Sequence, residues 1–231
     1  ETGFANVPVT LLWAGPDGDF GTTADNETWS QNTNGSGGYL FSNLPAGEFR
    51  VTVDTAIQSA AGFGTNSADP DGGNNSTAEL TLATAGSNLN QDFGYTGSGS
   101  IGDRVWYDVN SDGVQDPGEP GIAGVDVTVT WFGPDNTLGG TDDVVYTTTT
   151  IADGIYTVSF LPPGTYQVEV DDTDLPNGIN NPTYDLDGVG TPHVAATVTL
   201  GLGQNRTDVD FGYVGSGTIG DLVWHDIDGN G

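Results

Sequence analysis

The sequence of 231 residues contains no cysteine, no methionine and no lysine. Without cysteine the chain cannot form disulfides, so in an oxidising compartment a bound metal is the expected cross-link. No apolar run approaches the roughly 18 to 20 residues that a membrane helix needs, and no signal-peptide pattern is visible. Because even residue 1 is not methionine, we expect a processed chain or a piece of a longer one.

Basic residues are almost absent as well. Three arginines stand against 32 acidic residues, and the formal net charge is −29. Such a surface repels nucleic acid and anionic membranes, so neither is an expected partner. It also repels itself unless cations neutralise it, which suggests bound calcium; a halophilic or merely soluble surface is the alternative. Five Trp, eight Tyr and nine Phe argue against disorder.

The chain contains an internal repeat of about 118 residues. Three blocks match in order: 1–17 with 119–135, 39–54 with 156–171, and 92–103 with 210–221. The first and last blocks share an offset of 118 residues (119 − 1 and 210 − 92). We therefore divide the chain into repeat 1 (1–96), repeat 2 (97–214) and a tail (215–231) that copies the beginning of repeat 2.

Apolar residues alternate with polar ones throughout both repeats, as in Val125, Val127 and Val129. A period of two predicts strands with one buried face, and Gly, Pro, Asn and Asp cluster between them. Seven such segments fall in repeat 2: 101–107, 125–130, 144–150, 156–160, 166–170, 194–200 and 209–213. The predicted fold is all-β, with two tandem seven-stranded antiparallel sandwiches. Repeat 1 lacks the strand that matches 101–107.

Residues 108–119 read D-V-N-S-D-G-V-Q-D-P-G-E. Oxygen-bearing side chains at positions 1, 3, 5, 9 and 12, with glycine at 6, follow the ligand order of an EF-hand calcium loop. The alternative is an acidic surface turn. The predicted ligands are the side chains of Asp108, Asn110, Asp112, Asp116 (directly or through water) and Glu119, with the carbonyl oxygen of Val114.

The tail carries half of a second loop. Asp226, Asp228 and Asn230 fall at positions 1, 3 and 5 of the motif, and Glu1 corresponds to Glu119. We expect these four residues to share a calcium ion between two chains. Weaker metal candidates recur in two loops of each repeat, where solvated turns are equally expected: Asp17, Asp19, Asp25, Asp69 and Asp71 in repeat 1, and Asp135, Asp143, Asp185 and Asp187 in repeat 2.

Three features together carry a resemblance to a known family. They are Ile-Gly-Asp-x-Val-Trp at 101–106, the loop 108–119, and the Gly-x-Tyr…Leu-Pro-x-Gly-x-Tyr pattern within 154–170. In these the chain resembles the calcium-binding B-repeat domains of serine-aspartate repeat (Sdr) surface proteins, relatives of the collagen-adhesin B domain. The resemblance implies a prealbumin-like (Ig-like) β-sandwich, secretion, and a stalk or spacer role at a cell surface. Many relatives carry a Lys–Asn isopeptide cross-link, which a chain without lysine cannot form.

An enzymatic role has little support. The two histidines, His193 and His225, lie outside any repeated constellation. Paired carboxylates are abundant, but glycosidase chemistry needs two at a set separation in a cleft. We therefore expect no catalytic residues.

Two functions remain. The first is a structural subunit of an extracellular stalk or fibre, in which the strand within 217–231 of one chain inserts into repeat 1 of the next. The simpler alternative is that the chain is a segment of one long covalent array of adjacent repeats. The second function is an adhesive module that binds a host protein or polysaccharide.

Overall fold

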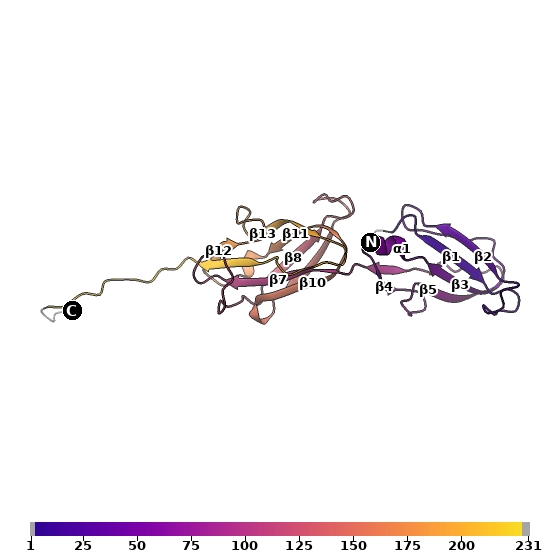
Figure 1. Cartoon of the computed structure of the whole chain (residues 1–231), viewed down its shortest axis with the longest axis horizontal. Coiled ribbons are helices and arrows are strands. Elements are labelled where there is room, and N and C mark those ends of the chain that lie inside the picture. The colour runs from indigo at the N-terminus through magenta and orange to yellow at the C-terminus, as the bar shows by residue number, and fades with distance from the viewer. Residues whose placement is uncertain (1–2, 228–231) are drawn as a thin grey trace.

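The computed structural model describes residues 3–227 (Figure 1). Repeat 1 and repeat 2 are all-β units that lie end to end, and residues 216–227 extend away from repeat 2 without forming a strand. The all-β prediction is confirmed. Among the described residues, no helix is long and apolar enough to cross a membrane.

Repeat 2 is built from two sheets. One has the order β10-β7-β15-β12, with β14 also paired to β7, and the other has the order β13-β11-β8-β9. The strands of the first sheet are β7 (Gly99–Tyr107), β10 (Ile155–Leu161), β12 (Ile179–Tyr184), β14 (Asn205–Arg206) and β15 (Phe211–Gly215). The strands of the second sheet are β8 (Asp126–Trp131), β9 (Val144–Thr149), β11 (Gly164–Val170) and β13 (Val194–Leu200). Short 3-10 turns, η1 (Ala152–Gly154) and η2 (Asp172–Asp174), connect them.

Strand β7 is the centre of its sheet. It pairs antiparallel with β10 and parallel with both β14 and β15. Its side chains Ile101 and Val105 belong to the core, Trp106 packs against Tyr184, and all three are at most 1% exposed. At Gly102 an added Cβ would overlap the carbonyl oxygen of Tyr156, so β10 can lie this close only to a glycine. Burial of these side chains and this close approach fix β7 in place.

Repeat 1 has one full sheet and a small second one. The full sheet has the order β2-β1-β3-β5, from β1 (Pro8–Trp13), β2 (Glu27–Asn32), β3 (Gly47–Val53) and β5 (Thr77–Leu82). The small sheet pairs β4 (Thr65–Ala68) with β6 (Gly94–Thr96), and the helix α1 (Ala56–Ala60) precedes β4. Residues 38–44, which match β10, form no strand. Among the described residues nothing takes the place of β7 in this repeat.

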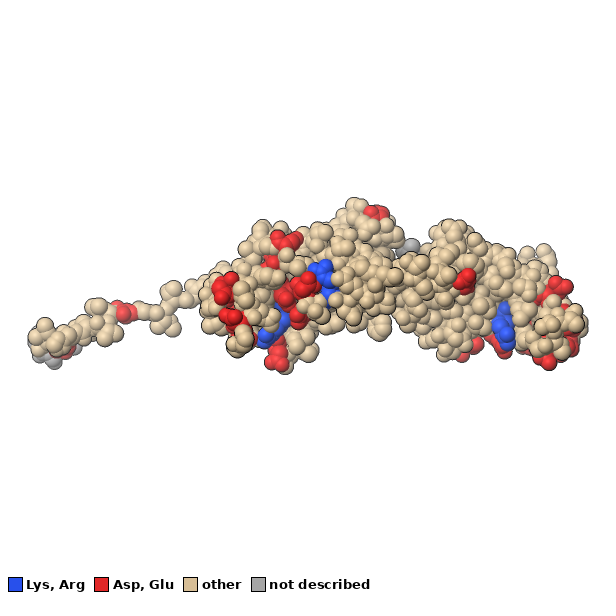
Figure 2. Space-filling view, viewed as in Figure 1, with Lys and Arg blue, Asp and Glu red and all other residues tan. Residues whose placement is uncertain are grey.

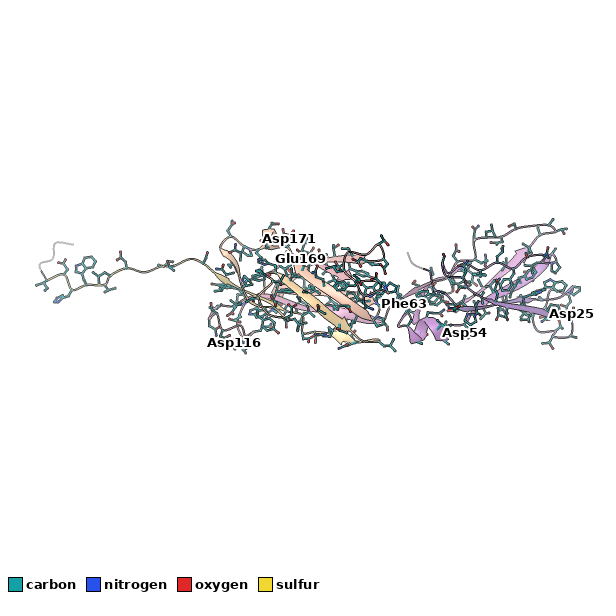
Figure 3. All side chains as sticks on the ribbon, turned by 90° about the horizontal axis from the view of Figure 1, so that it is seen from above. Asp25, Asp54, Phe63, Asp116, Glu169 and Asp171 are labelled. Carbon is teal, nitrogen blue, oxygen red and sulfur yellow. The ribbon has the colours of Figure 1, made fainter. Side chains whose placement is uncertain are left out.

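The two repeats pack against each other where they meet. Phe63 lies between them (Figure 3), and its ring meets the ring of Trp131 edge-on at 6.2 Å between centroids. Gly62 approaches Pro163 and Leu202 so closely that a Cβ would overlap the proline ring. This apolar contact joins repeat 1 to the Leu-Pro-Pro end of repeat 2.

Repeat 2 differs from the prediction in strand number and direction. It has two strands more than the seven predicted, because β12 and β14 lack the alternation of apolar residues on which the prediction rested. β12 contains Asn180, Asn181 and Pro182, which suit an edge strand with irregular pairing. The expectation of a purely antiparallel sandwich is wrong, since β7 runs parallel to β14 and β15. The domain boundaries at residues 96 and 214 stay predictions.

Candidate metal centre

The loop after β7 is held closed by hydrogen bonds to its first carboxylate. Asp108 accepts the backbone N–H of Ser111 at 2.7 Å and that of Gly113 at 2.9 Å. Gly113 has a φ of +72°, a left-handed conformation that glycine adopts at little cost. The glycine at loop position 6 thus turns the chain back so that the acidic residues on either side of it face each other.

Glu119 closes the other end of the loop. Its two carboxylate oxygens accept the backbone N–H groups of Val109 at 2.7 Å and Asp116 at 3.0 Å. Asp108 is fully buried and Glu119 is 7% exposed, and neither belongs to an ion pair found among residues 3–227. Hydrogen bonds alone compensate the negative charge of these two carboxylates, and a bound cation would add to that compensation.

Asn110 occupies the space between the other two acidic side chains. Its amide nitrogen donates to Asp112 and Asp116, at 3.0 Å in each case. The amide oxygen accepts the backbone N–H of Asp112 at 3.1 Å. The structure therefore brings all five predicted side-chain ligands into one network. The sixth, Val114, was predicted to contribute only its carbonyl oxygen, and its side chain is largely exposed.

The ligand shell is not closed around a point. Within the described part of the chain, no three Asp, Glu or His side chains converge tightly enough to hold a metal ion as they stand. For calcium the Asn110 amide would need to rotate so that its oxygen faces inward, and the Asp112 and Asp116 carboxylates would need to move with it. These are side-chain rotations within a loop whose backbone is already turned.

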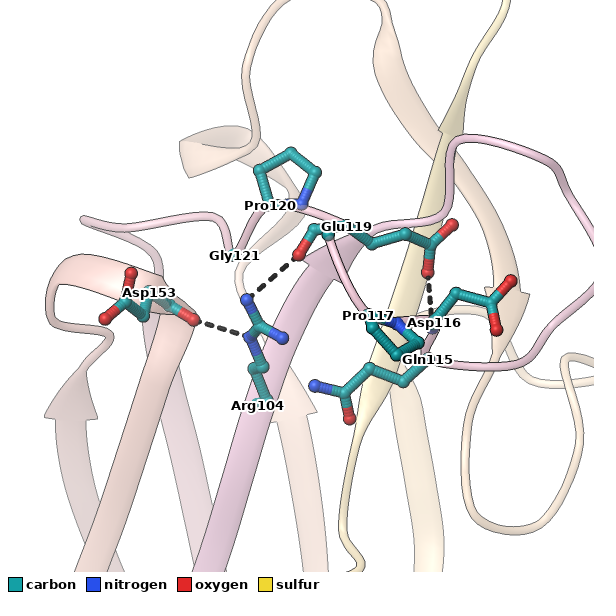
Figure 4. Close-up of a pocket in the computed structure, with 9 residues that line it drawn as sticks. Arg104, Gln115, Asp116, Pro117, Glu119, Pro120, Gly121 and Asp153 are labelled. Carbon is teal, nitrogen blue, oxygen red and sulfur yellow. Dashed lines mark hydrogen bonds between the residues drawn. The ribbon is translucent and has the colours of Figure 1, made fainter.

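Arg104 anchors the end of the loop, which sequence reasoning did not foresee. Its guanidinium donates to the carbonyl oxygens of Asp153 at 2.6 Å and Glu119 at 3.1 Å (Figure 4). This ties the last loop residue to η1 on the next hairpin. The sequence did not indicate a role for Arg104, because the repeat does not keep an arginine there: the matching residue of the tail is Leu222.

The electrostatics of Asp108 suit an ionised ligand. Burial acts to raise the pKa of its carboxyl, but the Thr183 hydroxyl and the backbone N–H groups of residues 111–113 outweigh it and lower the pKa below the ordinary value. A depressed pKa gives the folded state stability above the unfolded pKa, and this stability is lost as the pH falls through the folded pKa. Asp108 is therefore ionised at neutral pH, as a calcium ligand must be.

The predicted junction site lies mostly beyond the described residues. Glu1, Asp228 and Asn230 are outside them, and only Asp226 is placed, near the end of the tail. Calcium binding by these four residues stays a prediction.

The weaker candidates divide into turns and one buried group. Asp17, Asp19, Asp69, Asp71 and Asp135 accept backbone N–H groups two to six residues further along the chain, as capped turns do. Asp143 accepts the N–H of Gly139, Asp187 accepts that of Ala196, and Asp25 lies against Gly15. Figure 3 shows Asp25 at the outer end of repeat 1 and Asp116 at the end of repeat 2 that lies away from repeat 1.

Asp185 stands apart from these turns. It is 4% exposed, and neither of its carboxylate oxygens has a hydrogen-bond donor. Burial, followed by the charge of Asp187, raises the pKa of this carboxyl. Among the weaker candidates, this one gains most from a cation.

A second acidic group lies beside β7, and its partial burial at Asp103 and Asp210 was not predicted. Asp103, Asp208 and Asp210 lie near one another; Asp208 forms an ion pair with Arg206 at 2.6 Å, and Arg104 is the positive charge that acts on Asp103 and Asp210. Burial and the neighbouring Asp103 raise the pKa of Asp210 to about 7. Across the molecule the acidic residues are unevenly spread, and Figure 2 shows them gathered on repeat 2 and at the outer end of repeat 1.

We predict that Asp210→Asn stabilises repeat 2 at alkaline pH. Because the folded pKa is raised, ionised Asp210 opposes folding above about pH 7, and this cost disappears as the pH falls toward 4. The side-chain oxygen of asparagine can still accept the backbone N–H of Arg104, which lies 2.9 Å from the Asp210 carboxylate. Since the carboxyl is partly exposed, the expected gain at pH 8 is about 1 to 2 kcal/mol in the free energy of unfolding. Urea unfolding at pH 8 and pH 5 measures it. An equal gain at both pH values would contradict the assignment.

The fold and the loop define a class: an all-β repeat module with an EF-hand-type loop between strands. Residues 99–213 match the SdrD B-like domain family. The whole chain aligns with serine-aspartate repeat-containing protein F of Staphylococcus epidermidis at 32% identity and with protein E of Staphylococcus aureus at 31%. The chain therefore belongs to the B-repeat domains of Sdr surface proteins, as the resemblance predicted.

The chain is similar to only part of each relative. It spans 13% of protein F and 19% of protein E. Among solved structures, a minor pilin of Streptococcus agalactiae matches with a TM-score of 0.36 at 15% identity, over 96% of this chain and 88% of the pilin. A Bacillus anthracis protein matches with a TM-score of 0.43 at 14% identity, over 93% of this chain and 32% of that one.

Proposed function

We propose that this chain is a structural, non-enzymatic module of an extracellular stalk or fibre, in which calcium stiffens each repeat. The observation that carries the proposal is the pair of buried carboxylates, Asp108 and Glu119, that close one loop and form no ion pair within residues 3–227. Membership of the B-repeat domains of surface proteins supports the stalk role.

Calcium would act on the fold through the position of the loop. The loop begins where β7 ends, and Asp108 donates its backbone N–H to Tyr213 of β15. It returns at Gly121, which forms an isolated bridge with Trp106. An ion bound by the loop would therefore hold the end of the central strand against its neighbours. The loop brings these residues near one another only in the folded state, so the free energy of calcium binding would add to the free energy of folding.

The finer form of the proposal concerns how modules are joined. Residues 217–231 of one copy would supply repeat 1 of the next with the strand that matches β7, by donor-strand exchange. The half loop in the tail, with Glu1 of the neighbour, would then hold a calcium ion at each joint. Because such a contact is head-to-tail and need not close, it would extend into a filament.

Calorimetry with and without calcium tests the stabilising role. With calcium about a hundredfold above its Kd, the linkage is worth about 3 kcal/mol, which raises the unfolding temperature of repeat 2 by roughly 10 °C. Chelation with EDTA should remove this increase, and magnesium at equal concentration serves as the control. An unfolding temperature indifferent to EDTA would overturn the calcium role.

A further inference from the structure

Repeat 1 carries an open apolar groove of about 600 Å³. Its floor comes from β1, β3 and β5, and its two walls are the segments 37–44 and 85–92. Leu44, Leu80 and Leu82 line it and are only half-buried. A groove of this kind exposes leucines that the rest of the fold would bury.

The same place in repeat 2 is filled by β7. By the repeat offset, the three leucines match Leu161, Val198 and Leu200, which are at most 1% exposed. The two walls match β10 and the stretch from β14 to β15, which are the neighbours of β7 in the sheet. Equivalent hydrogen bonds also join the two walls in each repeat. The Tyr39 hydroxyl donates to the carbonyl oxygen of Gln91 in repeat 1, and the Tyr156 hydroxyl donates to that of Val209 in repeat 2, each at 2.5 Å. The groove therefore has the lining of a strand site.

The tail has the sequence that fits this site. Residues 215–224 repeat residues 97–106 at eight of ten positions, and differ only at Thr218 for Ser100 and Leu222 for Arg104. Ile219 and Val223 are fully or almost fully exposed (106% and 97%), whereas the matching Ile101 and Val105 are fully buried. Burying side chains of this size is worth roughly 1.5 to 3 kcal/mol each. An exposed strand sequence and an open strand site are thus present in one chain.

Strand direction decides which copy supplies the tail. In repeat 2, β7 runs parallel to β15, so a strand inserted in repeat 1 must run parallel to the matching β6. β6 leads toward repeat 2, and the tail leaves repeat 2 at the end away from repeat 1 (Figure 1). A tail folded back on its own chain would cross the length of repeat 2 and enter the groove antiparallel to β6. A tail from a second copy, placed beyond repeat 1, enters in the required direction.

We infer that the groove of repeat 1 binds residues 217–224 of a second copy in the register of β7. This binding site rests on the proposed head-to-tail function, for which it is the point of contact between two copies. Ile219 then takes the place of Ile101, and Gly220 takes that of Gly102 against the carbonyl of Tyr39. Trp224 takes the place of Trp106 and reaches Gly3, the residue that matches Gly121. Gly3 approaches Ser36 in repeat 1 as closely as Gly121 approaches Asp153 in repeat 2.

Gly220 gives a selective test of this site. Nothing lies within 4 Å of a Cβ added at Gly220, so Gly220→Val leaves both repeats unchanged in the free chain. In the groove the valine would overlap the wall segment, as it would at Gly102. We expect wild-type chains to grow in mass with concentration in light scattering, while the Trp224 emission shifts to shorter wavelength. Gly220→Val should remain a monomer. The matched control, Leu222→Arg, installs the residue that β7 carries and should assemble.

Peptide binding separates this inference from the calcium proposal. The Gly220→Val chain keeps an open groove, so a synthetic peptide of residues 215–226 should bind it one-to-one, and the same peptide with valine at position 220 should bind at least tenfold more weakly. Wild-type chains that stay monomeric, or equal binding of both peptides, would overturn the groove assignment. Stabilisation of the monomeric Gly220→Val chain by calcium would still support the stalk role in that case. Assembly without any effect of EDTA on unfolding would reject the calcium role alone.

Discussion

Replacing Gly102 by valine is expected to unfold repeat 2 and leave repeat 1 folded. The Cβ at this position would overlap the carbonyl oxygen of Tyr156 and press on the Cα of Thr157 on β10. Both are backbone atoms of a paired strand, so the clash cannot be relieved by a side-chain rotation. The expected cost is about 3 kcal/mol or more in the free energy of unfolding.

Hydrogen exchange measured peptide by peptide checks this prediction. Protection should be lost across β7, β10 and β15, and it should persist in β1 and β3 of repeat 1. Gly190→Ala is a suitable control, because nothing lies within 4 Å of a Cβ there and its φ is not in the positive range that favours glycine. Full protection of β10 in Gly102→Val would show that the close approach does not hold the sheet. The comparison with Gly220→Val is informative, since the two glycines occupy one sequence motif in two different surroundings.

Replacing Glu119 by glutamine is expected to abolish the calcium-dependent part of stability. The substitution removes the bidentate carboxylate that ends the loop. In the wild-type chain the two carboxylate oxygens of Glu119 accept the backbone N–H groups of Val109 at 2.7 Å and Asp116 at 3.0 Å. The glutamine amide has only one oxygen and can accept only one of them. The loss of linkage is about 3 kcal/mol when calcium is a hundredfold above the wild-type Kd, and the lost hydrogen bond costs about 1 kcal/mol more.

The matched control for that variant is Glu169→Gln, on the exposed face of β11. It makes the same chemical change without touching the loop. Calcium titration followed by thermal unfolding should show a normal increase for the control and none for Glu119→Gln. An equal calcium response in both variants would exclude Glu119 as a ligand.

The strands with alternating apolar residues were predictable, and the irregular ones were not. Val125, Val127 and Val129 alternate strictly and are all fully buried, because one face of β8 covers the core. β12 and β14 form through their neighbours: Pro182 sits opposite Tyr213, and Arg206 opposite Ile101, in strands whose own residues disfavour pairing. The strand propensity of the residues in β12 and β14 does not predict this pairing.

The candidate site was predictable in its ligand order but not in its surroundings. The spacing from Asp108 to Glu119 follows from what calcium requires, so a linear motif suffices. The tie from Arg104 to Asp153 joins residues 49 positions apart, and the burial of Asp210 depends on three strands meeting. The groove of repeat 1 lies between segments 37–44 and 85–92, and their positions in space cannot be derived from the sequence pattern.

The most direct measurement of the head-to-tail account is amide hydrogen exchange in residues 217–224 of the unmodified chain, with calcium, at low and high protein concentration. The tail of an isolated chain forms no strand, so its amides exchange freely when the protein is dilute. At high concentration the account predicts protection of this segment comparable to that of β7, together with new protection in 38–44. Free exchange of the tail at every concentration would contradict it.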